Sequence, residues 1–278
     1  MRSKGLKILI LIIFINGIFI AQSPKLYSTT ENTIRLYNVL GQGAFTLLKG
    51  VVQGKVKSFE DAGKCFLFGS ISGYGFFEAK RMVGKGKITG GILLANLSAS
   101  ISENVSRGEN PLSYLGYSFG PVRIHMATPL AKNNPGFINL SISSKEIVGL
   151  ILSMKNSNKI RIRNGLITFQ SNEPLGRNVL GWSSGIYPTV VEGAPKHIFN
   201  HEAVHVVQSI QTMSVSPEPF MSLKSNPPQK KKSFINYGGL NLSLIGTIND
   251  LTLYGLVPYD KRWPEIEAYT FAKENNSK

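Results

Sequence analysis

The spacing of apolar residues changes near Tyr117, and this change limits the fold more than any other feature of the sequence. Before that point, in residues 33–54, apolar residues recur about every 3.6 positions, as on one face of an α-helix. After it, in residues 122–126 and 138–142, apolar and polar residues alternate, as in a half-buried β-strand. The sequence therefore predicts an α+β fold with N-terminal helices, a central antiparallel β meander and a C-terminal helical module.

The N-terminal helical region is rich in glycine. A Ser58-Phe59-Glu60-Asp61 sequence has the form of a capping box and predicts a second helix through about Met82. The uncharged stretches 65–77 and 88–102 are shorter than the roughly 20 residues that span a bilayer. Small residues at four-residue spacing in 88–102 favour closely packed helices, as in membrane bundles. A packed helical layer and a membrane-attached hairpin both stay open, as does a strand within 88–102.

An Asn-Gly pair at 164–165 gives the sharpest local prediction in the β region. This pair favours a two-residue type I′ turn between antiparallel strands. The turn sets Ile162 opposite Ile167 and Ile160 opposite Phe169, with all four side chains on one face.

The remaining segments are assigned from apolar runs and from prolines and glycines. Residues 147–154, IVGLILSM, predict a buried strand, whereas 171–194 predict a loop-rich passage. A helix is expected from about Pro195 to Met213, residues 236–256 have a mixed and partly helical pattern, and Pro264 opens a final helix.

These elements divide the chain into four segments. They are a signal peptide at 1–21, a Gly-rich helical region at 22–113, an antiparallel β region at 114–194, and a helical metal-binding module at 195–278.

The N-terminal residues 1–21 have the form of a secretory signal: three basic residues, an apolar run and then Ala21. An uncleaved membrane anchor is the alternative. Either reading predicts an extracytoplasmic location, whether periplasmic, secreted or associated with the envelope. There, the formal net charge of +15, reduced by three on cleavage, would meet anionic lipids or envelope polymers, and no nucleic-acid partner is expected.

Histidine and carboxylate residues are the candidates for any metal site, because Cys65 is the only cysteine. Three of the four histidines lie in residues 197–205, which contain His201-Glu202-Ala-Val-His205. On a helix, His201 and His205 share a face and can bind one metal ion, while Glu202 lies beside them.

This H-E-x-x-H segment resembles the zincin metallopeptidases, and it also resembles uncharacterised secreted bacterial proteins with an HE-x-[VI]-H-x-x-Q helix. In the gluzincin branch, a downstream glutamate, often followed by alanine, is the third zinc ligand. The resemblance implies Glu267, which precedes Ala268, as that ligand. Glu265 is the alternative and points about 200° away on a helix; His197 is a further alternative.

The resemblance implies an exported zinc-dependent metallopeptidase that acts on a peptide or protein substrate. Zn²⁺ held by His201, His205 and Glu267 would activate a water molecule, and Glu202 would act as the general base. An oxyanion donor is also expected, and Tyr254, Tyr259 and Tyr269 are candidates by residue type alone. The alternative function is a non-enzymatic envelope or membrane-associated protein with a structural or degenerate metal site.

Overall fold

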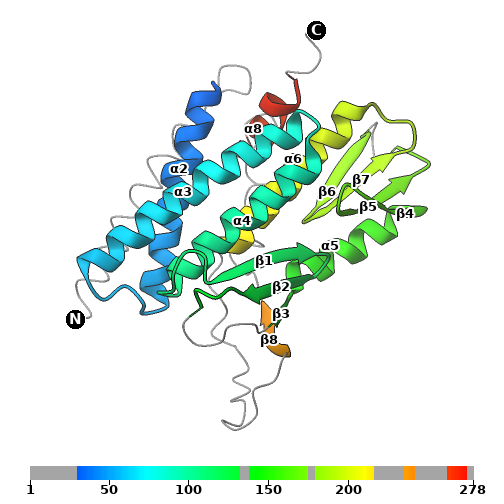
Figure 1. Cartoon of the computed structure of the whole chain (residues 1–278). Helices are drawn as coiled ribbons and strands as arrows, with labels where there is room; N and C mark the ends of the chain where they lie inside the picture. Colours follow the sequence, from blue (N-terminus) through cyan, green and yellow to red (C-terminus); the bar gives the residue numbers. More distant parts are fainter. Residues whose placement is uncertain (1–29, 132–137, 175–178, 216–234, 242–261, 274–278) are drawn as a thin grey trace.

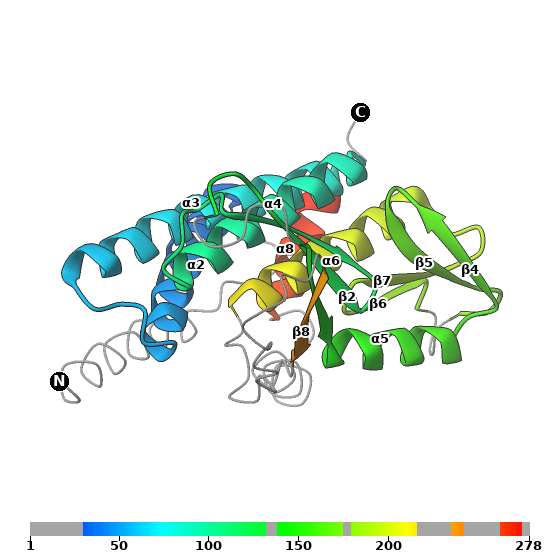
Figure 2. The same ribbon diagram turned by 60° about the horizontal axis from the view of Figure 1, so that its bottom comes forward.

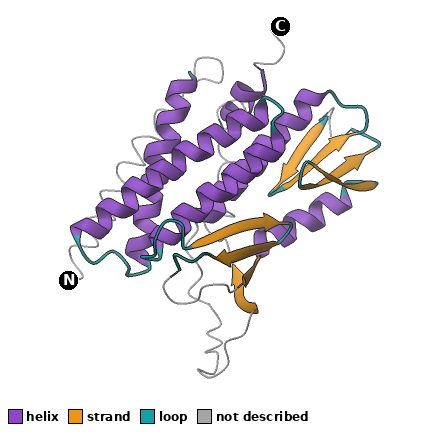
Figure 3. Ribbon diagram, viewed as in Figure 1, coloured by secondary structure: helices purple, strands orange, loops and turns teal. Residues whose placement is uncertain are grey.

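The computed structural model describes residues 30–131, 138–174, 179–215, 235–241 and 262–273. The α+β fold class is confirmed: helices come first, a β region follows, and the chain returns to helices near its C-terminus (Figure 1, Figure 3). The predicted signal segment 1–21 lies outside the described residues.

Three helices form the N-terminal layer and lie side by side (Figure 1). They are α2 (Glu31–Val52), α3 (Phe59–Gly84) and α4 (Ile88–Ser106). The predicted capping box is confirmed: Asp61 N donates to Ser58 Oγ at 3.1 Å, and Ser58 N donates to the Asp61 carboxylate at 3.0 Å. The alternative that residues 88–102 form a strand is wrong.

Glycines allow α2 and α3 to pack at short range. A Cβ atom on Gly69 would lie 2.6 Å from the Cβ of Thr46, and one on Gly73 would overlap the backbone oxygen of Asn38. The small residues therefore serve helix packing. Among the described helices, none combines the length and the apolar character that a membrane span requires.

The first sheet, sheet A, has the strand order β1-β2-β3-β8. Its strands are β1 (Tyr114–Phe119), β2 (Val122–Ala127), β3 (Ile138–Ser143) and β8 (Ile235–Asn241). The first three form the predicted antiparallel meander, and β8 pairs with β3 in parallel. Of the segment 236–256, for which a partly helical pattern was expected, residues 236–241 are therefore strand, and residues 242–256 lie outside the described residues. The polarity of this sheet is unusual, because Arg123 and His125 are buried while Leu115, Met126 and Ile142 are exposed.

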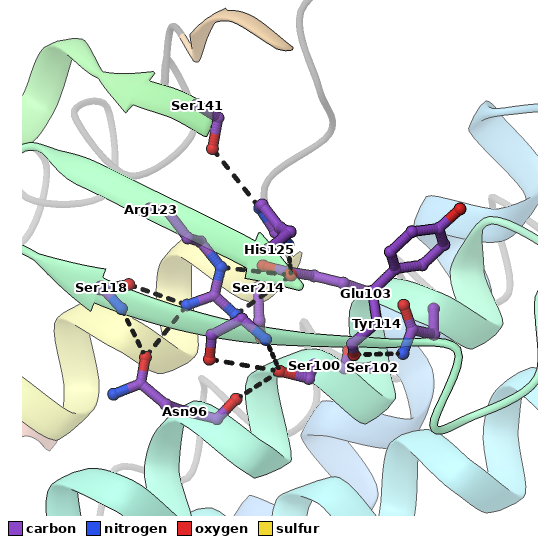
Figure 4. A network of polar contacts seen from close by, with 12 residues as sticks. Asn96, Ser100, Ser102, Glu103, Tyr114, Ser118, Arg123, His125, Ser141 and Ser214 are labelled. Atoms are coloured by element: carbon purple, nitrogen blue, oxygen red, sulfur yellow. Dashed lines mark hydrogen bonds and ion pairs between the residues drawn. The ribbon is translucent and has the colours of Figure 1, made fainter. Parts of the chain in front are cut away.

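A buried polar network joins sheet A to α4 (Figure 4). The guanidinium of Arg123 on β2 donates to Glu103 Oε2 from Nη2 at 3.1 Å and from Nε at 3.3 Å, and its Nη1 donates to Ser118 Oγ at 2.8 Å. Burial raises the pKa of Glu103, but the positive charges of Arg123, His125 and Lys49 outweigh burial and lower it to about 2.

The low pKa of Glu103 predicts that acid destabilises the fold. The ordinary value is 4.5, so the ionised carboxylate stabilises the folded state above that pH, and this contribution disappears as the pH falls towards about 2. The shift is worth about 3 kcal/mol. We expect the free energy of unfolding, measured by urea denaturation, to fall over this acid range in the wild type.

The Glu103→Gln variant provides the control for this pH dependence. It should be less stable at neutral pH, because Arg123 loses its carboxylate, and its stability should vary less between pH 5 and 2. An equally steep acid limb in the variant would assign the acid sensitivity to other groups.

The second sheet, sheet B, has the strand order β4-β5-β7-β6. Its strands are β4 (Lys159–Arg163), β5 (Leu166–Ser171), β6 (Gly181–Ser184) and β7 (Tyr187–Val191). β5 and β7 are parallel, and the other neighbouring pairs are antiparallel. The segment predicted as loop-rich therefore contains two short strands.

The predicted hairpin is confirmed in its turn and register. The residues at 164–165 have φ angles of 53° and 79°, as a type I′ turn requires. Ile162 pairs with Ile167, and Ile160 pairs with Phe169. β4 lies at the edge of the sheet, however, so Ile160 and Ile162 are 57% and 73% exposed while Phe169 is buried.

The predicted strand at 147–154 is wrong, because these residues belong to helix α5 (Ser144–Lys155). The Ser143 hydroxyl caps this helix and accepts from Glu146 N at 3.4 Å. Among the described side chains of α5, the buried positions are Glu146, Gly149 and Ser153, at helical spacing, and much of the apolar side-chain surface faces outward. A continuous apolar run does not distinguish a helix from a strand. In α5 the buried face is narrow, and the residues on it are polar or glycine.

Two further helices complete the fold: α6 (Lys196–Val215) and α8 (Trp263–Lys273). Helix α6 contacts α3, α4 and α8, and also β6 and β7 of sheet B (Figure 2). Its buried residues share one apolar core with α3, α4, sheet B and α8. This central position fixes the helix that carries the histidines.

Candidate metal and catalytic site

Two histidines of α6 meet at the candidate site. Pro195 precedes the first residue of α6, a position that suits proline because a helix leaves its first N–H groups unpaired. His201 and His205 lie one turn apart, and their Nε2 atoms are 3.2 Å from each other. Apolar neighbours such as Val204 and Val207 are completely buried, so the helix has little freedom to rotate.

Glu265, in the first turn of α8, brings a carboxylate to the two imidazoles. Its Oε2 atom lies 3.4 Å from His201 Nε2 and 3.5 Å from His205 Nε2. Among the described residues, these three form a group whose ligand atoms all lie within 4.8 Å of one another.

The spacing of these three atoms fits a zinc ion. Tetrahedral zinc has nitrogen and oxygen ligands at about 2.0–2.1 Å, which places neighbouring ligand atoms roughly 3.3–3.4 Å apart. The three observed separations of 3.2, 3.4 and 3.5 Å lie close to that value. Two imidazoles and one carboxylate are also a donor set that zinc accepts.

Glu267, the preferred third ligand in the sequence analysis, does not join this cluster. Its carboxylate lies on another side of α8, where Oε2 is 2.7 Å from Lys80 Nζ and 2.8 Å from Gln208 Nε2. Its Oε1 accepts from Asn38 Nδ2 at 2.6 Å. The structure therefore places Glu265, the alternative, beside the histidines. The two glutamates are separated around the helix as their two-residue spacing predicts.

The other candidates take different positions. His197 lies in the first turn of α6 and is half-buried, and it is not part of the three-residue group. The ring of Tyr269 meets the ring of His201 edge-on, with their centroids 4.6 Å apart. Tyr254 and Tyr259 lie outside the described residues.

Glu202 is buried between α6 and strand β6. A Cβ atom on Gly181 would lie 2.8 Å from Glu202 Oε1 and 2.6 Å from Ile198 Cγ2, so glycine leaves the space that this carboxylate occupies. Burial raises the pKa of Glu202 to about 7; the nearby charge of His205 opposes this rise, and the Glu265 carboxylate adds to it. A carboxyl group with a pKa near 7 can both accept and return a proton at neutral pH.

The pKa values of the two histidines shift in opposite directions. Burial lowers the pKa of His201. Burial also acts to lower the pKa of His205, but hydrogen bonding to Glu265 and the charge of Glu202 raise it to about 9. These values describe the residues without a metal ion, which would compete with the proton for the imidazole nitrogen.

The sequence alone indicates no role in the site for Gln208, Lys80 or Asn38. The spacing of Gln208 could have indicated that it lies beside His205, because it follows that histidine by three residues and residues three apart share a helix face. No sequence pattern links Lys80 and Asn38 to the site, because they belong to α3 and α2 and meet α8 only in the folded chain.

Comparisons with protein-family models, curated proteins and solved structures found no match.

Proposed function

We propose that this protein is an exported zinc metallopeptidase in which His201, His205 and Glu265 hold the metal ion. The observation that carries this proposal is the near-equilateral triangle of two imidazole nitrogens and one carboxylate oxygen. Three protein donors are typical of catalytic zinc sites, whereas structural sites have four. The proposal replaces Glu267 with Glu265 as the third ligand.

The chain's own residues supply proton transfer beside this ion. Bound zinc would act as a Lewis acid towards the scissile carbonyl and would lower the pKa of water to about 7. Glu202 accepts the proton of the attacking water and returns it to the leaving amine nitrogen. Burial keeps this carboxylate away from bulk solvent and, in the metal-free chain, raises its pKa, which favours uptake of a proton.

The position of strand β6 in sheet B supports the proposal that the substrate is a peptide. It lies at the end of the order β4-β5-β7-β6, so within the described part of the sheet its outer edge has no neighbouring strand. An extended peptide can bind such an edge through main-chain hydrogen bonds. Because Gly181 of β6 contacts Glu202, a peptide on this edge would bring its backbone close to the proposed base.

The proposed location is extracytoplasmic, and the proposed contact surface is an anionic membrane or envelope polymer. Both rest on sequence: the basic and apolar residues of 1–21 and the formal net charge of +15. Fractionation of cells that express the full chain tests them, and recovery in the cytoplasmic fraction would contradict export.

Removal and return of zinc test the proposed function. Purified protein should contain about one zinc per chain, as a single three-ligand site requires. Dialysis against a chelator should abolish hydrolysis of a peptide library, read by mass spectrometry, and stoichiometric zinc should restore it. Retained zinc without hydrolysis of any peptide would favour the non-enzymatic alternative.

Substitution of the third ligand provides the matched comparison. Glu265→Gln should weaken zinc binding strongly, because it removes the only carboxylate in the triangle. Glu192→Gln, on an exposed glutamate paired with Lys159, should leave zinc content unchanged. Unchanged zinc affinity in the Glu265 variant would exclude this assignment of the site.

A further inference from the structure

The side-chain amide of Gln208 has only one orientation that satisfies its neighbours. One end of the amide lies 2.8 Å from Glu267 Oε2 and 3.0 Å from the backbone oxygen of Pro264. Both of these atoms accept hydrogen bonds, so this end must be the NH₂ group. The other end is therefore Oε1, which lies 2.7 Å from His205 Nδ1.

This orientation determines which nitrogen of His205 is available to a metal. Oε1 of Gln208 can only accept, so Nδ1 of His205 must carry the hydrogen. Nε2, the atom directed at His201 and Glu265, is then left to bind the ion with its lone pair. A hydrogen bond to the distal nitrogen also limits rotation of the ring.

The buried pair of Lys80 and Glu267 in turn fixes Gln208. Lys80 Nζ donates to Glu267 Oε2 at 2.7 Å and to Asn38 Oδ1 at 2.7 Å, and Asn38 donates to the other carboxylate oxygen. The exposed fractions of Lys80 and Glu267 are 2% and 1%. With lysine and asparagine donating to it, Glu267 is an acceptor towards Gln208.

Gln208 also links both elements that supply the proposed ligands. It belongs to α6, which carries the histidines, and it donates to the oxygen of Pro264, the residue before Glu265 on α8. One amide thus contacts a histidine of the cluster and the backbone next to its glutamate.

We propose that Gln208 is a positioning residue that fixes the tautomer and ring orientation of His205 for metal binding, with the Lys80–Glu267 pair orienting Gln208. This inference rests on the proposed function, because it assumes that the ion binds at His201, His205 and Glu265. It assigns Glu267 a role beside the metal site rather than in it.

A pair of glutamine variants on α6 tests the inference. Gln208→Leu removes the amide that contacts His205, whereas Gln211→Leu removes a half-buried amide that contacts Gln42 on α2, outside the three-residue group. Zinc affinity is measured by competition with a chromophoric chelator. We expect an affinity loss of about 10–100-fold for Gln208→Leu and an unchanged affinity for Gln211→Leu.

A spectroscopic readout separates positioning from a general loss of structure. In zinc-loaded protein labelled with ¹⁵N, the imidazole of His205 should show a slowly exchanging hydrogen on Nδ1 and a metal-bound Nε2. In Gln208→Leu, that hydrogen should exchange faster, while the thermal unfolding midpoints of both zinc-free leucine variants should be similar.

The outcomes distinguish this inference from the proposed function. Equal zinc affinity in the two variants, or zinc bound through Nδ1 of His205, would overturn the role of Gln208 while wild-type hydrolysis still supported the peptidase. Wild-type protein that binds no zinc would overturn both the proposed function and this inference.

Discussion

Replacing Glu202 with glutamine is expected to lower kcat for peptide hydrolysis by about 10²–10⁴-fold, the usual effect of losing a general base. Glutamine keeps the size of the side chain but cannot accept a proton. Because burial disfavours the charged carboxylate and raises the pKa of Glu202 in the metal-free chain, the neutral amide should not reduce the stability of that form. The variant should therefore fold and bind about one zinc, and its turnover is compared with wild type at equal zinc content.

Zinc content decides how this result is interpreted. Loss of zinc together with activity would mean that Glu202 supports the metal site and would leave its role as a base without support. Unchanged turnover in Glu202→Gln would show that another group moves the proton.

The second large effect is expected at the buried pair of Lys80 and Glu267. Lys80→Met or Glu267→Gln alone should each reduce the free energy of unfolding by about 3–5 kcal/mol, because each leaves a buried charge without its partner. The double variant should lie within about 1–2 kcal/mol of wild type, since it buries neither charge. Chemical denaturation of the zinc-free forms measures all four proteins.

An exposed ion pair serves as the control. Lys64 and Glu60 are 2.6 Å apart on α3 with side chains 60% and 76% exposed, so Lys64→Met should leave stability almost unchanged. Additive losses at Lys80 and Glu267 would show that the two charges do not stabilise each other. Zinc affinity measured on Glu267→Gln would also show how far the pair acts on the metal site.

Local signals predicted much of the fold. The capping box at Ser58 and the Asn-Gly turn at 164–165 depend on neighbouring residues alone, and both are confirmed with their hydrogen bonds or register. The alternation in residues 122–126 predicted strand β2 but not its orientation. Its polar residues Arg123 and His125 face inward because Glu103 on α4 provides a buried partner. That partner is distant in sequence.

The candidate site was predictable to the extent that it is local. His201, Glu202 and His205 share one helix, so their spacing alone predicts their arrangement. The choice between Glu265 and Glu267 depended on which face of α8 meets α6, and no periodic signal gives that rotation. The buried ammonium of Lys80 on α3 requires a carboxylate partner, and Glu267 is that partner. This pair orients α8 so that Glu265 lies beside the histidines.

The two faces of α8 have a consequence for how the protein is made. One face supplies Glu265 to the histidines, and another supplies Glu267 to Lys80. A ribosome synthesises α2, α3 and α6 before α8, so a nascent chain has both histidines without their carboxylate, and Lys80 without its counter-ion. Docking of α8 completes both at once. If the proposed function holds, the chain becomes able to hydrolyse peptides only when α8 has docked.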